Sequence, residues 1–197
     1  MIKKIDQSAE GENVQQAGND IVNTHINNYN YIQKQLPKHI AKVIIVLDKA
    51  LDVPDLPPKW NKLIPPKIQE KIDYNDLKTR RILIENYGNY AGIVEAAYET
   101  LDNEKPNSKR RFLHSINWKY QELKNKVLVG NEIQNEIELI RANSDQFIDN
   151  IVNDLHEEYC DALNKDDGIM GEDILFCIYC IVAKAFIDCK ILEPPVI

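Results

Sequence analysis

The side chains best suited to binding a metal are one histidine and three cysteines near the end of the chain. His156 and Cys160 are four positions apart, and Cys177 and Cys180 form a Cys-x-x-Cys pair. These are ligand types that Zn²⁺ prefers. Cys177 and Cys180, however, stand in a continuous apolar run, without the glycine and turn residues of a zinc knuckle. Small buried thiols explain the pair more simply and are the favoured interpretation. A small zinc-binding protein is the alternative.

Other signals of catalysis are weak in this sequence. The Cys-x-x-Cys pair lies more than a turn inside an apolar helix, whereas reactive pairs sit at exposed helix N-termini. Adjacent carboxylates such as Glu157 and Glu158 point in different directions on a helix and do not converge on one metal. The histidines are scattered, and the sequence contains no Walker-type loop, Gly-x-Gly-x-x-Gly motif or Gly-x-Ser-x-Gly motif. We therefore expect a protein that is not an enzyme and has no cofactor.

The clearest basic patch comes from two triplets that flank one predicted helical hairpin. They are Lys109, Arg110 and Arg111, preceded by Lys78, Arg80 and Arg81. A nucleic-acid-binding component that uses Lys109, Arg110 and Arg111 is a second alternative, with an indirect contact to DNA. The net charge of -7 argues against a general nucleic-acid binder, which needs a positive surface. Ion pairing with the many acidic residues is the favoured interpretation of the patch.

Composition and cysteine placement indicate the class of protein that carries these residues. A chain of 197 residues with 44% hydrophobic residues can bury a substantial core. No secretory signal is visible at the N-terminus. The most apolar segment, 174–187, contains Lys184 and is shorter than the ~20 residues of a membrane span. We expect a cytoplasmic protein with reduced cysteines and no membrane contact.

The chain divides into three predicted regions. Residues 1–32 are rich in Asn, Gln and Gly, which predicts a short polar segment that is either β or disordered. Residues 33–65 comprise a helix and a Pro-rich linker, and residues 66–197 form a helical interaction domain. Within the second region, residues 39–51 favour a buried helix. A strand competes there because residues 43–46 are β-branched.

Apolar spacing predicts an all-α fold, an antiparallel bundle of long amphipathic helices. Apolar residues recur at steps of three, four or seven over residues 77–101, 113–127 and 133–159. The short polar breaks between these segments favour antiparallel neighbours. Ser108 is placed to cap the second helix.

A last predicted helix, from about residue 172 to 189, is apolar almost all round. Such a helix must be covered on most faces, either in the centre of the bundle or by a second chain. This favours a homo-oligomer or a stable complex with other proteins.

Three stretches also carry a resemblance to a known family. They are Lys71–Tyr90, Lys109–Tyr120 and Ile174–Pro195. Together they resemble the helical C-terminal domain of bacterial ABC-three-component systems, which are anti-phage conflict systems related to Lamassu. Residues 7–21 are similar to a polar N-terminal segment common in bacterial conflict proteins.

The resemblance implies a role for the domain. In that family the helical domain joins an effector, such as a nuclease or protease, to an SMC-like ABC ATPase and a middle component. No effector is recognisable in the roughly 65 residues that precede the helical part, so the chain is either an adaptor version or an effector that acts without chemistry, and no catalytic residue is carried over. The resemblance therefore implies a non-catalytic adaptor of an anti-phage defence complex, with the SMC-like ATPase and the middle component as partners.

Overall fold

The computed structural model describes residues 40–51, 66–129, 135–162 and 169–195. Every regular element in these ranges is helical and none is a strand, which confirms the predicted all-α class. Residues 40–51 are helical, so the competing strand interpretation is wrong. The polar segment 1–32 and the Pro-rich linker lie outside the described residues.

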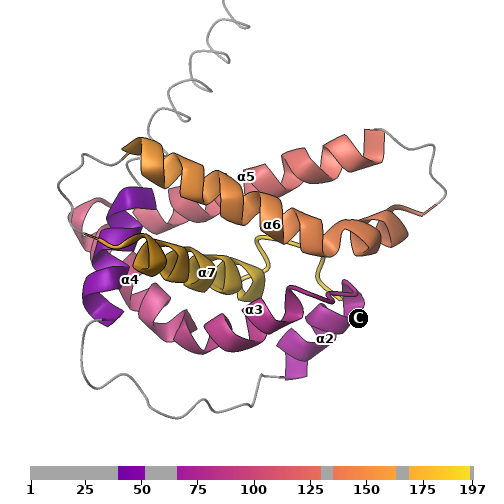
Figure 1. Ribbon diagram of the computed structural model, residues 1–197, viewed down its shortest axis with the longest axis horizontal. Coiled ribbons are helices and arrows are strands. Elements are labelled where there is room, and N and C mark those ends of the chain that lie inside the picture. Colours follow the sequence, from indigo (N-terminus) through magenta and orange to yellow (C-terminus); the bar gives the residue numbers. More distant parts are fainter. Residues whose placement is uncertain (1–39, 52–65, 130–134, 163–168, 196–197) are drawn as a thin grey trace, which may run out of the picture. The chain divides into compact units, whose positions relative to one another are not determined.

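The elements after residues 40–51 are named as in Figure 1. They are α2 (Pro66–Tyr74), α3 (Arg81–Tyr87), the 3-10 turn η1 (Gly88–Tyr90), α4 (Ala91–Glu104), α5 (Ser108–Val129), α6 (Glu136–Ala162) and α7 (Gly171–Ile187). The helices α5 and α6 pack on each other and run antiparallel (Figure 1). The prediction of long antiparallel helices is therefore confirmed for this pair.

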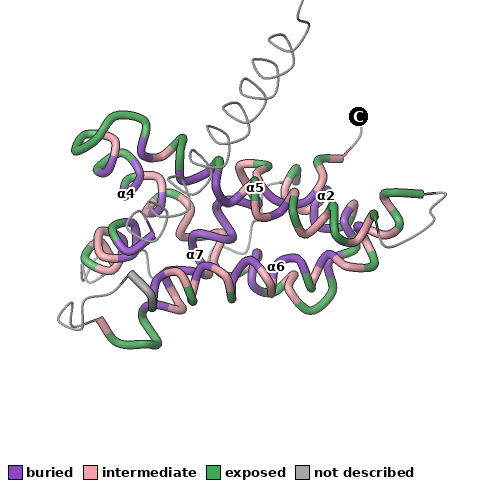
Figure 2. The backbone as a smooth tube through the Cα atoms, turned by 90° about the horizontal axis from the view of Figure 1, so that it is seen from above, coloured by how far each residue is buried: buried purple, intermediate pink, exposed green. Residues whose placement is uncertain are grey.

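The apolar helix α7 is the centre of the core. It contacts α3, η1, α4 and α6, and in Figure 1 it lies between α6 and the α3–α4 segment. The residues of its C-terminal half, from Cys180 to Phe186, are all buried, and in Figure 2 the purple of buried residues follows this helix. Helices of the same chain therefore cover most of α7. Of the two coverings expected from the sequence, the structure shows the centre of the bundle, and an oligomer or stable complex stays a prediction.

The predicted single helix over residues 77–101 is interrupted. Residues 77–80 precede the first helix, and the rest of the predicted helix is divided into α3, η1 and α4, with the change at Gly88. In a 3-10 turn the side chains of residues three apart eclipse each other. This geometry brings Tyr87 and Tyr90 against the same ring, that of Phe176 in α7, with centroid distances of 5.3 and 5.1 Å. The interruption thus arranges two aromatic side chains on one partner.

The segment between α2 and α3 is held by α6. The carboxylate of Asp145 accepts hydrogen bonds from the backbone N–H groups of residues 78–80, at 2.9 to 3.3 Å. These groups precede α3 and would otherwise lack helical acceptors. Although burial alone would raise it, the pKa of Asp145 is lowered by these three donors. The nearby Arg141 Nε donates to the carbonyl of Tyr74 at 2.6 Å.

Candidate interaction surfaces

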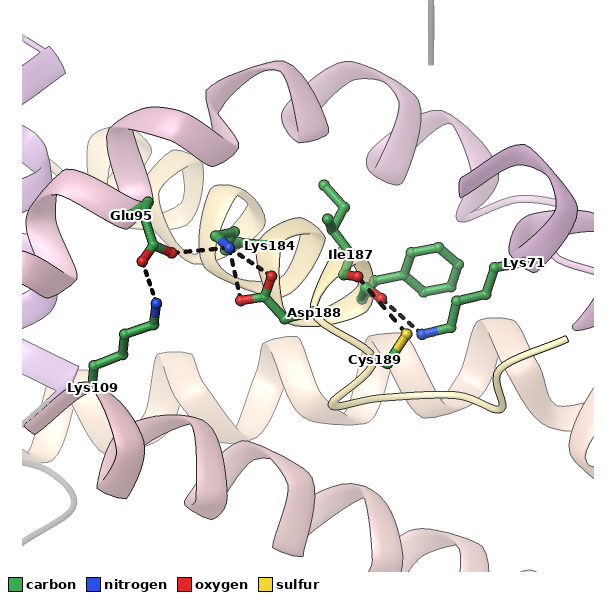
Figure 3. Close-up of polar contacts among 8 residues, drawn as sticks. Lys71, Glu95, Lys109, Lys184, Ile187, Asp188 and Cys189 are labelled. Carbon is green, nitrogen blue, oxygen red and sulfur yellow. Dashed lines mark hydrogen bonds and ion pairs between the residues drawn. The ribbon is translucent and has the colours of Figure 1, made fainter. Parts of the chain in front are cut away.

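The first predicted site residue, Lys109, belongs to a charged network between three helices. Its Nζ pairs with Glu95 of α4, and the other oxygen of Glu95 lies 3.0 Å from Lys184 Nζ of α7. Lys184 also donates to both carboxylate oxygens of Asp188, at 2.6 and 2.8 Å. Figure 3 shows Lys184 between these two acids. The hydrogen bond from Lys109 lowers the pKa of Glu95. Lys109 therefore links helices within the fold.

The other two predicted site residues, Arg110 and Arg111, are exposed on α5. Arg111 donates to the carbonyl of Pro106 at 2.9 Å. Within the described ranges no ion pair involves Arg110 or Arg111. The preceding basic triplet is occupied by acids: Lys78 pairs with Asp76, Arg80 with Asp149, and Arg81 with Asp73 and Glu85. Among the described residues, Arg110 and Arg111 are thus the two members of these triplets that have no ion pair.

The predicted zinc ligands do not come together. Cys177 and Cys180 are buried inside α7, where burial raises the pKa of Cys177 to about 12 and also raises the pKa of Cys180. His156 and Cys160 lie on α6, where the Sγ of Cys160 is 3.9 Å from Nδ1 of the histidine. Among the residues that the structure describes, no three His, Cys, Asp or Glu side chains are placed to hold a metal ion. The zinc interpretation loses its geometric basis.

A cluster of four rings, which we call the aromatic surface, lies where α7 meets α3 and η1. It consists of Tyr87, Tyr90, Phe176 and Tyr179, all only partly buried. Tyr87 contacts both Phe176 and Tyr179, the latter at a centroid distance of 5.0 Å. Edge and tilted ring contacts of this kind are favourable and hold the rings in place. Burial raises the pKa of Tyr87 and of Tyr90.

The aromatic surface continues into an open pocket of about 510 Å³ between α6 and α7. Tyr179 belongs to both. The remaining lining residues are mostly polar: Arg80, Gln146, Asp149, Val152, Asn153, His156 and Leu175. The Nε of Arg80 lies against Asp149 without hydrogen-bond alignment. An apolar patch with a polar margin is typical of a protein-binding surface.

Sequence reasoning did not identify the aromatic surface. The available signal was two pairs of aromatic residues, each with a spacing of three: Tyr87 with Tyr90, and Phe176 with Tyr179. Such pairs are more often core residues than binding residues. Only the packing of α7 against α3 shows that the two pairs meet and remain partly exposed.

A buried lysine anchors the segment that follows α7, residues 188–195, which we call the C-terminal strap. Lys71 Nζ donates to the carbonyls of Phe186 and Ile191, at 2.7 and 2.9 Å, and lies 4.3 Å from the centroid of the Phe186 ring. Figure 3 shows Cys189 of the strap beside this ammonium group. Burial lowers the pKa of Lys71 to about 8. Its charged form is therefore costly in the folded protein.

Two further side chains hold the same strap. Asn75 exchanges hydrogen bonds with the backbone of Glu193, through Nδ2 at 2.8 Å and Oδ1 at 3.0 Å. The carboxylate of Glu193 accepts from Tyr120 at 2.8 Å and Lys124 at 2.9 Å. Burial opposes ionisation of Glu193, but these donors outweigh it and lower its pKa. The strap is thus tied to both α2 and α5.

Comparison with known proteins adds one finding. A family model described as C-terminal domain 10 of the ABC-three component (ABC-3C) systems matches residues 45–193, well over half of the chain. The matched range contains all elements from α2 to α7. No curated protein and no solved structure matches the chain. Within the described residues, no helix is both long and apolar enough to cross a bilayer.

Proposed function

Since the chain belongs to the family of C-terminal domain 10 of the ABC-three component systems, we propose that it is a non-catalytic adaptor that binds other components of its system. The proposed partners are an SMC-like ABC ATPase and a middle component, as in Lamassu-related anti-phage systems. The proposed setting is a cytoplasmic defence complex. An adaptor acts by contacting the other components of its system, so the proposal requires a surface that can bind another protein.

The aromatic surface is the observation that carries this proposal. Tyrosine and phenylalanine are enriched in protein interfaces, where a few buried rings contribute most of the binding free energy. The rings of Phe176 and Tyr179 pack against those of Tyr87 and Tyr90, at centroid distances of 5.0 to 5.3 Å. Side chains fixed in this way lose little conformational entropy on binding. The adjacent polar pocket supplies hydrogen-bonding groups for the margin of an interface.

Co-expression tests the proposal. The protein is produced together with the products of its neighbouring genes, and light scattering measures the mass of the purified complex. We expect a stable complex with the ATPase, the middle component or both. Replacing Phe176 and Tyr179 with alanine should weaken it by about 2 kcal/mol or more, which is about thirtyfold in Kd.

Two variants control for effects on folding. Tyr179→Phe keeps the ring packed on Tyr87 and should retain most of the binding. Tyr74→Ala removes another partly buried tyrosine, on α2 and outside the aromatic surface, and should leave the complex intact. A monomer that binds none of the neighbouring products would refute the adaptor role. A complex that survives loss of both rings would place the interface elsewhere.

A further inference from the structure

The helix α5 concentrates positive charge in an acidic protein. Its 22 residues include six basic side chains and one acidic side chain, whereas the whole chain has a net charge of -7. The basic residues are Lys109, Arg110, Arg111, Lys119, Lys124 and Lys126, and the acidic one is Glu122. The neighbouring α6 has the opposite composition, with eight acidic residues and one arginine. Charge is thus segregated between two packed helices.

Half of the basic residues of α5 serve the fold. Lys109 pairs with Glu95 of α4. The other two link α5 to α6 and to the C-terminal strap: Lys119 lies 2.6 Å from Glu158 and 3.7 Å from Asp154, and Lys124 lies 2.7 Å from Glu136 and 2.9 Å from Glu193. These lysines are neutralised internally and are not available to a partner.

The outward face of α5 keeps the remaining positive charge and an exposed tryptophan. Arg110, Arg111, His114 and Lys126 are exposed, and Trp118 is 49% exposed. Residues 111, 114 and 118 follow each other at steps of three and four, which places them on one side of the helix. An indole and two guanidinium groups about two turns before it on the same helix are residue types that are enriched in interaction hot spots. We call these five residues the α5 face.

We propose that the α5 face is a second docking surface, and that it binds an acidic amphipathic segment of a partner protein. In this arrangement an apolar side chain of the partner packs on Trp118, and its carboxylates bind Arg110 and Arg111. The planar fork of a guanidinium group matches a carboxylate with two parallel hydrogen bonds. The α5 face shares no residue with the aromatic surface, so the proposal does not depend on the binding role of that surface.

Charge around the α5 face favours a protein over a nucleic acid. The exposed Glu122 lies one turn after Trp118 on the same helix. This carboxylate and the net charge of -7 oppose a polyphosphate backbone, whose binding requires several free cations. A segment with a few carboxylates needs only local complementarity. Lys109, which a nucleic acid would also require, is already paired with Glu95.

The intrinsic fluorescence of Trp118 provides a direct test. The chain has two tryptophans, so Trp60→Phe in the full-length protein leaves Trp118 as the only one. The protein is titrated with a synthetic peptide that carries Leu and Glu at helical spacing. The same peptide with Lys in place of Glu and an oligo(dT) strand serve as comparison probes. We expect a saturable change with the acidic peptide, which weakens at high salt because exposed charges are screened.

Charge reversal then identifies the residues involved. The double variant Arg110→Glu with Arg111→Glu should lower affinity for the acidic peptide about tenfold or more. The matched control, Lys49→Glu with Lys67→Glu, changes the net charge equally at exposed positions on residues 40–51 and α2 and should retain binding. Circular dichroism verifies that both are folded. Tighter binding of oligo(dT) than of the acidic peptide, no fluorescence change with the acidic peptide, or equal loss in both double variants would each overturn the proposal.

Discussion

The buried amine of Lys71 allows a quantitative test of the structure through the pH dependence of stability. Lys71 is 3% exposed, and its Nζ donates to two backbone carbonyls at the end of α7 and in the C-terminal strap. Replacing it with methionine keeps most of the aliphatic volume but removes the charge and both hydrogen bonds. The two lost hydrogen bonds destabilise the variant at every pH, and the lost charge changes how stability varies with pH.

The sign of that change follows from the direction of the pKa shift. The pKa of Lys71 is about 8 in the folded protein, against an ordinary value of 10.5. Between these values the unfolded chain holds more protons than the folded one, so the free energy of unfolding rises with pH. The full shift corresponds to about 3 kcal/mol, and the part gained from pH ~7 to pH ~9 is about 1.4 kcal/mol. Below pH ~8 the wild-type protein bears the whole charging penalty.

Urea unfolding of wild type and Lys71→Met, followed by circular dichroism, measures this effect. The thiols of Cys177 and Cys180 also titrate in the unfolded chain at alkaline pH, but they do so in both proteins. The difference in unfolding free energy between the two therefore isolates Lys71. We expect wild type to gain about 1.4 kcal/mol over the variant from pH ~7 to pH ~9. The exposed Lys126→Met serves as a control, with a difference that stays constant.

Two results would refute this reasoning. A constant difference would mean that Lys71 is not desolvated in the folded protein. A difference that falls with pH would mean that its acidic surroundings dominate. The electrostatic effects of Cys189, Glu193 and Asp188 favour the charged form of Lys71, although less strongly than burial disfavours it. The measurement therefore decides which of two opposing electrostatic effects is larger at this position.

Two further predictions concern stability and thiol reactivity. Asp145→Ala should lower the free energy of unfolding by about 1 to 2 kcal/mol, because residues 78–80 lose their shared acceptor, whereas the exposed neighbour Gln146→Ala should change it little. Because those bonds lower the pKa of Asp145, the advantage of wild type over the variant should disappear as pH falls through that pKa, as measured by urea unfolding. A disulfide-exchange reagent should modify the exposed Cys160 and Cys189 quickly in the native protein. It should modify the buried Cys177 and Cys180 only after denaturation. Four equally fast thiols would show that α7 is not buried.

Helix class and the burial of α7 could be predicted because both depend on local apolar spacing. The break at Gly88 could not, since a three-residue 3-10 turn advances the chain by about one turn and keeps the apolar stripe nearly in phase. Ser108 was correctly placed at the start of α5. Its hydroxyl, however, donates to the carbonyl of Lys105, and the N–H of Lys109 is instead accepted by Asp102 at 2.8 Å.

Contacts between distant segments explain what else sequence reasoning missed. Asp145 accepts from the start of α3 although it lies 65 to 67 positions away in sequence. The basic run Lys109-Arg110-Arg111 gives no indication that its first member pairs inward while the next two are exposed. That division depends on where α4 and α7 place Glu95 and Lys184. The basic run could therefore be recognised from the sequence, but only the packing of the helices showed which of its charges are paired inside the fold.

The ion pairs among Lys109, Glu95 and Lys184 also connect the two proposed binding surfaces, the α5 face and the aromatic surface. Lys109 begins α5, Glu95 belongs to α4 and Lys184 belongs to α7, so one chain of ion pairs joins the helix of the α5 face to the helix of the aromatic surface. Lys184 is 9% exposed, and partly buried pairs are screened by water less than surface pairs. Helices fixed to each other in this way hold the two proposed surfaces at a constant separation. Two partners bound to them would then be held in one relative orientation, which is what distinguishes an adaptor from a flexible tether.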